Sequence, residues 1–431
     1  MKRLLGAILI LGLLFSFIPT LSVSAAVPET GAKAVLLADL ETGNILYAKN
    51  PDERVYPAST TKLMTALLAI ESCSLSEQVT GTENAAWGLD GLSTRIYIAD
   101  GEVFTLAQLL DALLIVSAND AANTIAEHVS GSIDAFVARM NERAAELGAT
   151  NTHFMNPSGM HHDDHYTTVR DLALIAREVQ KHPELMQIAA KSYYEIAPTN
   201  LFPETRLGRA SNHLVNPASG ELYYPYATGL KTGFTEKAQF CLVATAEKDG
   251  MKMLAVLTGC EAREAGSLGA KSLFEYGFEN FEQRVLFHAG DEVTTIPIRR
   301  AGDIKEIPLV AAEEISLLTL RGEADPETEI VTEKRAVAPL EAGTKLGTLT
   351  LKSDTEAART FDLVAKESYV LGTWSQLFRF IGKMLTSWIF YLILVLVLAF
   401  LKFRSDNIKR RRRRALRRKR QMEARERMKQ L

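Results

Sequence analysis

The stretch Pro57–Glu71, PASTTKLMTALLAIE, most constrains how this chain can fold. Its apolar residues recur at intervals of three and four, which predicts an amphipathic helix with a buried face. Ser59 and Lys62 stand three apart at its start, so their side chains share one helix face. A serine becomes a nucleophile when a base takes its proton, and a lysine can be that base when burial or a nearby cation lowers its pKa. The pair alone would equally suit a helix cap beside a solvated lysine.

Two later motifs favour the catalytic interpretation. Ser117 and Asn119 stand two apart in a break between two predicted helices, and Lys231-Thr232-Gly233 follows in a predicted strand. The ordered set S-x-x-K, S-x-N and K-T-G is the signature of active-site serine β-lactamases and penicillin-binding proteins. Each motif alone could be a helix cap or a strand edge. Three of them in this order, at domain-sized spacing, argue against chance.

The two ends of the chain predict export and membrane anchoring. A basic start, the apolar run Leu4–Ile18 and small residues up to Ala26 predict a secretory signal peptide over residues 1–26, with an uncleaved signal anchor as the alternative. Met384–Leu401 has no charged residue and is about as long as a membrane-spanning helix. The tail from residue 402 carries 15 Lys and Arg against 3 Asp and Glu. Basic clusters beside a span stay in the cytoplasm, so we expect the body of the protein on the outer face of the cell membrane.

Composition narrows the function classes further. Residues 4–401 carry 32 basic and 49 acidic residues, and an acidic body argues against nucleic-acid binding. The arginine run 409–414 could be a nucleic-acid patch, but beside a span it is better explained by topology, with attraction to anionic lipid as an added role. Three cysteines do not make a disulfide scaffold. Cys241 and Cys260 fall in neighbouring predicted strands, which leaves one bridge open, although we expect buried free thiols.

The order of the predicted elements indicates an α+β fold. Strands, a block of helices, three further strands and a closing helix describe a mixed antiparallel sheet packed by helices. The expected strands are Ala34–Asp39, Asn44–Tyr47, Leu230–Thr235, Gln239–Glu247 and Lys252–Gly259. The expected helices are Leu106–Val116, Ala121–Val129, Ile133–Leu147, Thr168–Lys181 and Ala265–Tyr276. From about residue 282, short segments of period-two character predict a small all-β domain.

The chain thus divides into six predicted segments. They are a signal peptide (1–26), a catalytic domain (27–281), a β-rich domain (282–370), an amphipathic juxtamembrane segment (371–383), a transmembrane helix (384–401) and a basic cytoplasmic tail (402–431).

The sequence resembles the serine-type D-alanyl-D-alanine carboxypeptidases, the low-molecular-mass penicillin-binding proteins, over roughly Val27 to Tyr369. Besides the three motifs, the resemblance rests on Tyr56-Pro57-Ala58-Ser59, Asn156-Pro157-x-Gly159, His165-Tyr166-Thr167-Thr168, Asp171-Leu172-Ala173, Arg263, Ala338-Pro339-Leu340 and Gly343. It implies a β-lactamase and penicillin-binding-protein-like transpeptidase fold. It also implies removal of the terminal D-alanine from peptidoglycan stem peptides, with covalent binding of β-lactam antibiotics.

The chemistry of acyl transfer assigns a role to each candidate residue. We expect Ser59 to be the nucleophile, Lys62 the general base, and Ser117 a relay of the proton to the leaving amine. The expected substrate-binding residues are Asn119, Lys231, Thr232, Gly233 and Phe234. Lys231 and Thr232 would hold the substrate carboxylate, and a second cation would help keep Lys62 neutral. By resemblance, the backbone N–H groups of Ser59 and Phe234 form the oxyanion hole.

No cofactor or metal is expected. The cluster His161–His165 contains zinc-ligand residue types, but five adjacent loop residues rarely converge on one ion, so we predict a solvated loop.

Two alternative functions stay open. A β-lactamase needs a deacylating base, and Asn156–Asp171 has no glutamate, although it holds Asp163 and Asp164. A non-catalytic penicillin sensor would need a signalling domain, and the arginine-rich tail contains none. An endopeptidase that cuts D-alanyl cross-links belongs to the same class as the carboxypeptidase.

Overall fold

The computed structural model describes residues 27–352 and 359–429, apart from residues 87, 88, 90 and 92. The predicted signal peptide, residues 1–26, lies outside this range. The chain divides into two compact units, which are described separately. The first unit holds residues 27–284 and 316–325, and the second holds 285–315, 326–352 and 359–429.

A five-stranded antiparallel sheet forms the centre of the first unit, in the order β2-β1-β9-β8-β7. The N-terminal hairpin completes this sheet because β1 pairs with β9, which comes late in the chain. Strand β7 carries Lys231, Thr232 and Gly233 and forms the opposite edge. The strands are β1 Ala34–Asp39, β2 Ile45–Lys49, β7 Ala227–Thr235, β8 Gln239–Lys248 and β9 Met251–Cys260.

Both faces of this sheet are buried at its three central strands, which explains why β1, β8 and β9 contain nearly continuous apolar runs. Along β1, Leu36 and its neighbours two residues away face one hydrophobic core, whereas Val35 and Leu37 face a second one. The same alternation separates Val256 from Leu257 on β9. This is the period of two that side chains follow along a strand.

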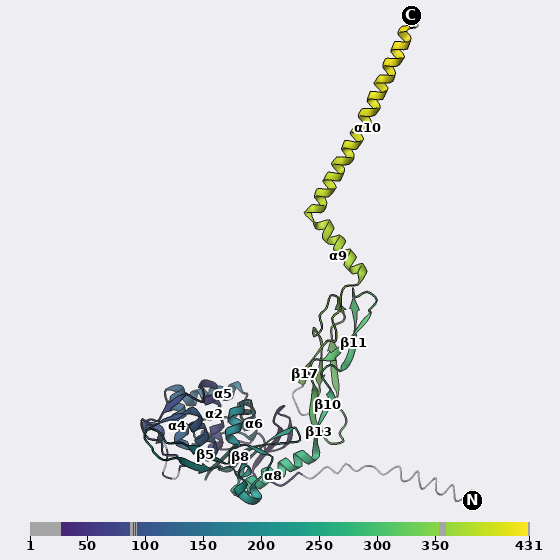
Figure 1. Ribbon diagram of the computed structural model, residues 1–431. Coiled ribbons are helices and arrows are strands. Elements are labelled where there is room, and N and C mark those ends of the chain that lie inside the picture. The colour runs from purple at the N-terminus through teal and green to yellow at the C-terminus, as the bar shows by residue number, and fades with distance from the viewer. Residues whose placement is uncertain (1–26, 87–88, 90, 92, 353–358, 430–431) are drawn as a thin grey trace, which may run out of the picture. The chain divides into compact units, whose positions relative to one another are not determined.

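Helices cover the two faces of the sheet (Figure 1). The helices on one face pack in the first core, and α8 packs in the second core on the other face. The helices of the first face include α2 Lys62–Ser72, α4 Asn119–Ser130, α5 Ile133–Glu146 and α6 Val169–Val179; the second face has α8 Arg263–Asn280. Helix α2 was predicted to bury one face, but Met64 and Leu68 are buried as well as Leu63 and Leu67. It is buried around most of its circumference because α4, α5, α6 and the sheet surround it.

The predicted helix Leu106–Val116 changes character halfway. It begins as α3 (Leu106–Asp111) and continues as a π-helical turn, η3 (Ala112–Val116). Ser117 ends the turn in the left-handed conformation, with φ 70°. We expected Asn119 in the break between the helices, but it is the first residue of α4 because the extended Ala118 acts as the N-cap.

Several short elements of the first unit were not predicted. Two-stranded pairs of three or four residues are too short to show a period-two pattern. These elements are β3 Gln78–Thr80 with β4 Val103–Thr105, β5 Tyr193–Ile196 with β6 Arg206–Arg209, helix α7 Pro183–Ala189, and the 3-10 turns η2 Glu83–Ala86, η4 His213–Val215 and η5 Pro217–Leu222. The helix predicted over Pro57–Glu71 begins as a 3-10 turn, η1 Ala58–Thr61, which continues into α2.

The second unit contains a six-stranded sheet in the order β14-β16-β17-β12-β11-β15. Its strands are β11 Glu292–Arg299, β12 Glu306–Ala311, β14 Thr328–Thr332, β15 Ala336–Val337, β16 Lys345–Leu351 and β17 Arg359–Ala365. A separate pair joins β10 (Phe281–Phe287) to β13 (Ile315–Leu320). The sequence placed β13 in the small β domain, but Leu318 packs in the second core of the first unit.

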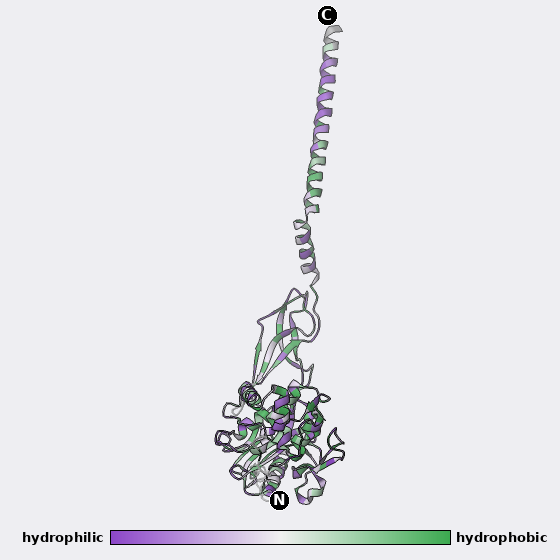
Figure 2. Cartoon of the chain, turned by 90° about the vertical axis from the view of Figure 1, so that its left-hand side faces the viewer, coloured by the Kyte–Doolittle hydropathy of each residue, from purple (hydrophilic) through white to green (hydrophobic). Residues whose placement is uncertain are grey.

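Two helices end the chain. Helix α9 (Thr373–Thr386) stops at Ser387, and α10 (Trp388–Lys429) follows, so the first residues of the predicted span complete α9 instead. The apolar part of α10 is confined to its beginning, and its remainder is polar (Figure 2). Within the described part of the chain, this is the one helix long and apolar enough to cross a membrane.

Candidate active site

Ser59 lies in the short turn η1, which leads directly into α2. The turn places Ser59 Oγ 3.0 Å from Lys62 Nζ. Ser59 is half-buried, so a substrate can reach its hydroxyl, whereas Lys62 is fully buried. The structure therefore brings together the two residues that the i, i+3 spacing predicted to meet.

Lys62 is held by two further oxygen atoms. Its Nζ lies 2.5 Å from Asn119 Oδ1, at the start of α4, and 2.5 Å from the Ser158 backbone carbonyl. Burial lowers the pKa of Lys62 well below its usual range, and the nearby charge of Lys231 lowers it further. An amine with a lowered pKa can exist in the neutral form that accepts a proton.

Ser117 stands two residues before Asn119, in the turn between η3 and α4. Its left-handed backbone is unusual for a residue other than glycine and marks a sharp reversal of the chain. The Ser117 side chain is half-buried, and its hydroxyl has no protein hydrogen-bond partner among the residues the structure describes.

Lys231 is the second fully buried lysine of the first unit. Its Nζ donates a hydrogen bond to the Thr232 carbonyl at 2.8 Å. Burial lowers the pKa of Lys231 to about 7, and the positive charge of Arg263 contributes. On the same strand, Thr232 Oγ1 lies 2.8 Å from Ser211 Oγ. Ser211 is in turn bound through its backbone N–H to the carbonyl of Ile115 in η3, so β7 is linked to the segment that ends at Ser117.

Gly233 allows β7 to lie directly against Ser59. A Cβ at this position would stand 2.8 Å from the Ser59 backbone nitrogen. The next residue, Phe234, is 47% exposed, and its ring packs on Phe240 with 4.4 Å between centroids. The strand edge beside Ser59 therefore presents backbone groups rather than a bulky side chain.

Sequence reasoning missed how the loop Asn156–Tyr166 supports the site. Besides the Ser158 carbonyl, which contacts Lys62, the loop brings Gly159 so close to the turn η1 that a Cβ would stand 1.9 Å from the Ala58 carbonyl oxygen. Asn156 Oδ1 accepts backbone hydrogen bonds from Ser158, Gly159 and Met160, which fixes the turn. The Asn-Pro-x-Gly motif was the sequence feature that could have indicated this turn, but the motif does not show which backbone carbonyl contacts Lys62.

The prediction that His161–His165 form a solvated loop is wrong for His165. His165 is 2% exposed, and its Nε2 lies 2.9 Å from Thr61 Oγ1 in the turn η1. Burial lowers the pKa of His165 to about 3, so this ring is neutral near pH 7 and buttresses the turn. The other four residues of the cluster are exposed.

The sequence left open whether Cys241 and Cys260 form a disulfide bridge, and the structure answers this question. Cys241 and Cys260 are buried free thiols, and burial raises the pKa of Cys241 to about 12 and that of Cys260 to about 11. No disulfide joins their two strands.

Comparison with known proteins identifies the family to which the chain is similar. The D-alanyl-D-alanine carboxypeptidase family model matches residues 21–262, and the model of the penicillin-binding protein 5 C-terminal domain matches residues 281–370. The chain is 34% identical over 379 residues to D-alanyl-D-alanine carboxypeptidase DacF of Bacillus subtilis, covering 85% of this chain and 94% of that protein.

Solved structures show the same fold. Penicillin binding protein 5 from Haemophilus influenzae superposes with a TM-score of 0.66 at 27% identity, covering 80% of this chain and 100% of that one. The peptidoglycan synthesis regulatory factor PBP3 from Streptococcus pneumoniae gives a TM-score of 0.67 at 27% identity, covering 79% and 99%. The chain belongs to the D-alanyl-D-alanine carboxypeptidase family of serine hydrolases.

Proposed function

We propose that this protein removes the terminal D-alanine from peptidoglycan stem peptides through an acyl-enzyme on Ser59, and that β-lactam antibiotics acylate the same hydroxyl. The observation that best supports the proposal is the arrangement of oxygen atoms around the Lys62 amine. A neutral lysine amine keeps two N–H groups, and Asn119 Oδ1 and the Ser158 carbonyl are placed to accept both. The amine lone pair is then left for the Ser59 hydroxyl, 3.0 Å away.

The proposed reaction has two steps. Ser59 Oγ attacks the carbonyl carbon of the penultimate D-alanine while its proton passes to Lys62 Nζ. The C–N bond to the terminal D-alanine then breaks, and a proton delivered through Ser117 completes the leaving amine. Water hydrolyses the ester in the second step, which releases the shortened peptide and restores the Ser59 hydroxyl.

Substrate binding is assigned to the edge of β7. The terminal D-alanine ends in a carboxylate, which the Lys231 cation and the Thr232 hydroxyl would hold. The backbone N–H groups of Ser59 and Phe234 would stabilise the oxyanion of the tetrahedral intermediate. Gly233 supports this because its missing side chain leaves the strand close to Ser59. Asn119 would fix Lys62 and contact the substrate amide.

The cellular setting forms part of the proposal. The leader would export residues 27–370, the apolar part of α10 would anchor them in the cell membrane, and the basic tail from residue 402 would stay in the cytoplasm. The catalytic part would then face the cell wall.

The test combines two measurements on one sample of the purified full chain in detergent. Release of D-alanine from a stem pentapeptide, together with a long-lived fluorescent penicillin label that Ser59→Ala abolishes, is the expected result. A label that persists in Ser59→Ala would refute the nucleophile. A label without D-alanine release would favour a sensor or an endopeptidase, and rapid loss of the label with hydrolysed penicillin would favour a β-lactamase.

A further inference from the structure

A group of metal-ligating side chains lies outside the proposed active site, at the surface of the first unit. The thiol of Cys73, the carboxylate of Glu77 and the imidazole of His128 place their ligand atoms within 4.8 Å of one another. His128 Nε2 and Glu77 Oε1 are already 2.9 Å apart. Cys73 is half-buried, and the side chains of His128 and Glu77 are 24% and 42% exposed, so the group is open to solvent.

We propose that Cys73, Glu77 and His128 bind one thiolate-preferring divalent cation, of which zinc is the representative. Cysteine sulfur, histidine nitrogen and carboxylate oxygen are the three protein ligand types of zinc, and a tetrahedral ion would complete its shell with water. A thiolate in the set selects against magnesium and calcium, which take oxygen ligands.

The backbone around the three residues is well fixed. Cys73 caps the end of α2 and donates its backbone N–H to the Ala69 carbonyl at 3.0 Å. Glu77 is held from both sides, because its N–H bonds the Ser74 carbonyl and its carbonyl accepts from Leu106. His128 lies in the last turn of α4. Two segments thus converge, the turn Cys73–Glu77 and the last turn of α4, and a small adjustment of side chains brings the ligand atoms to one ion.

The site connects the far ends of the two helices that carry the active-site amine and its amide partner. Lys62 begins α2 and Asn119 begins α4, whereas Cys73 and His128 lie at the other ends. At about 1.5 Å per residue, the spacing from Lys62 to Cys73 along α2 and from Asn119 to His128 along α4 separates the two sites by about 14–17 Å. A bound ion would therefore act as a cross-link between α2, α4 and the loop before β3, and would not take part in the acyl transfer.

One nearby charge opposes the cation. Arg139 reaches over from α5 and bonds Ser72 Oγ at 3.0 Å and the Val129 carbonyl at 3.4 Å. The proposal therefore predicts opposite effects for two kinds of substitution: loss of a ligand weakens binding, whereas Arg139→Gln strengthens it.

The experiment uses the full chain in detergent with its thiols reduced. Zinc is titrated against a competing chromogenic chelator, and cobalt is added to a second sample to detect its thiolate charge-transfer absorption. We expect one bound ion per chain and a cobalt–thiolate band that is lost in Cys73→Ser. His128→Gln should weaken zinc binding by at least about tenfold, since even an outer-shell partner typically contributes that much.

A matched control comes from an equivalent pair without a thiol. His288 Nδ1 lies 3.2 Å from Glu314 Oε2 at the surface of the second unit, so His288→Gln removes a His–Glu pair and should leave the zinc affinity unchanged. Failure of the wild-type chain to bind zinc overturns the proposal, as does binding that Cys73→Ser does not weaken. Thermal melts of each variant without metal verify that its fold is intact.

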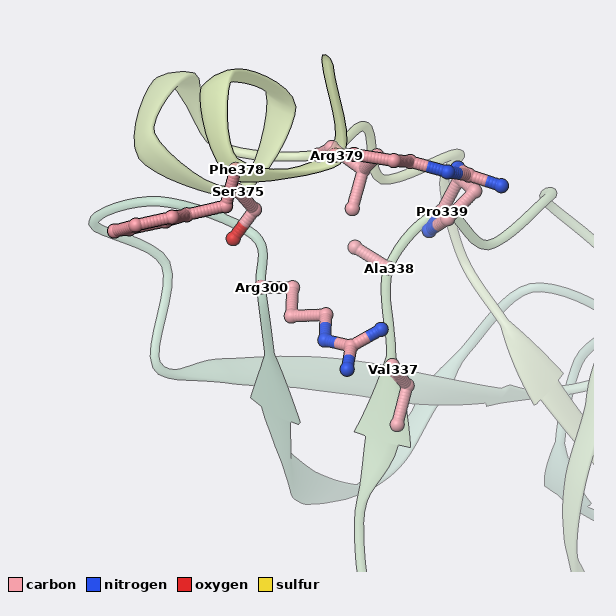
Figure 3. A pocket seen from close by; sticks show the side chains of 8 residues that line it. Arg300, Val337, Ala338, Pro339, Ser375, Phe378 and Arg379 are labelled. Atoms are coloured by element: carbon pink, nitrogen blue, oxygen red, sulfur yellow. The ribbon is translucent and has the colours of Figure 1, made fainter. Parts of the chain in front are cut away.

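A second inference rests on a pocket of the second unit. The pocket has a volume of about 610 Å³ and is lined by Arg300, Val337, Ala338, Pro339, Leu371, Ser375, Phe378 and Arg379. In Figure 3 the Arg300 side chain extends from the end of β11, and Ser375, Phe378 and Arg379 come from α9. No acidic side chain lines the pocket, and neither guanidinium has a salt-bridge partner among residues 27–352 and 359–429 as described.

Backbone contacts hold the start of α9 beside β11. The Gly372 N–H donates to the Arg300 carbonyl at 2.7 Å, and a Cβ at Gly372 would stand 2.4 Å from the Gly302 nitrogen. Along α9, Trp374 and Phe378 are 73% and 69% exposed, and the apolar part of α10 begins at Trp388. The pocket therefore combines cationic walls with apolar neighbours shortly before the chain enters the proposed span.

We infer that this pocket binds the phosphate of an anionic phospholipid in the outer leaflet. Guanidinium groups bind phosphate oxygens in a bidentate manner, and exposed aromatic side chains favour the lipid–water interface. This inference rests on the part of the proposed function that places residues 27–370 on the outer face of the membrane. It does not depend on the proposed acyl-transfer reaction.

The test reconstitutes the full chain in vesicles that contain a phosphatidylglycerol with a photoreactive headgroup, and maps the labelled peptides by mass spectrometry. Label is expected on the peptide around Ser375–Arg379, to be lost in Arg300→Gln and retained in the neighbouring control Arg299→Gln. Label on the basic tail serves as the internal reference for orientation and reconstitution. Equal labelling of Arg300→Gln, or complete competition by glycerol phosphate in solution, would overturn the lipid assignment.

Discussion

Replacing Gly233 with alanine tests whether close approach of β7 to Ser59 is required for acylation. The added Cβ would stand 2.8 Å from the Ser59 nitrogen and 3.1 Å from the Pro57 carbonyl oxygen. Ordinary contact begins at 3.4 Å, so the strand or the nucleophile turn must move by 0.6 Å. The backbone of Gly233 is not in the left-handed region, which means that this steric contact is the only conflict.

The expected loss follows from that displacement. A misplacement of about 1 Å at a reacting centre can lower a rate by about a hundredfold, so a shift of 0.6 Å should lower it roughly tenfold to a hundredfold. Overpacking should also destabilise the fold by about 1–3 kcal/mol. The assay is the second-order rate of labelling by fluorescent penicillin, with a thermal melt of the same sample.

The control is a glycine-to-alanine substitution at a position where the added methyl group meets no neighbouring atom. Gly382 in α9 has open space where its Cβ would lie, so Gly382→Ala should label at the parental rate. An unchanged labelling rate in Gly233→Ala would refute the reasoning, because the strand edge would then not need to lie against Ser59.

Three further predictions concern Lys231 and the anchor. Lys231→Ala should lower kcat/KM for D-alanine release roughly tenfold to a hundredfold, since hydrogen bonds to charged groups contribute about 1.5–3 kcal/mol; an unchanged value would mean that the carboxylate is held elsewhere. Burial lowers the folded-state pKa of Lys231 to about 7, so the unfolded chain binds more protons at this residue, and the contribution of Lys231 to the free energy of unfolding should rise with pH from about 7 to 10.5. Thermal melts across this window compare the wild-type chain with Lys231→Met, and the stability of the wild type relative to the variant should rise with pH. A chain that ends at Lys383 should be released from the membrane pellet by an alkaline carbonate wash, which removes proteins bound only at the membrane surface, and resistance to that wash would contradict the anchor in α10.

Local patterns were sufficient to predict the parts of the site that lie close in sequence. The spacing of Ser59 and Lys62 fixes a shared face whatever the rest of the chain does. The buried strands β8 and β9 were visible as apolar runs bounded by turn residues. The order of the three motifs then indicated that β7 lies beside the helices that carry Ser59 and Asn119. The hydrophobic period of one segment could not indicate this, because it carries no information about distant segments.

Contacts between distant segments could not be predicted in the same way. The Ser158 carbonyl offers no side-chain signal, because every residue has a carbonyl and only the folded loop directs this one to Lys62. His165 looked like one of three equivalent histidines, yet tertiary packing buries it against Thr61. Strand β13 has the same alternating pattern as its neighbours, and its place beside β10 depends on pairing that its own sequence does not encode.

The burial of two lysines in the candidate site is the feature of the fold that differs most from what the local sequence pattern predicts. A lysine at the start of an amphipathic helix would ordinarily extend to solvent, because burying an ammonium group is costly. Lys62 and Lys231 are both fully buried, and burial lowers the pKa of each. Their surroundings differ, since Lys62 has three oxygen partners and Lys231 has one backbone carbonyl. In the proposed mechanism Lys62 must be neutral to act as a base, whereas Lys231 must be charged to bind a carboxylate, and these roles need different surroundings. The free-energy cost of burying the Lys231 cation would then be relieved when an anionic substrate binds. If Lys231 binds the substrate carboxylate as proposed, substrate binding should therefore raise the pKa of this buried lysine in the edge strand.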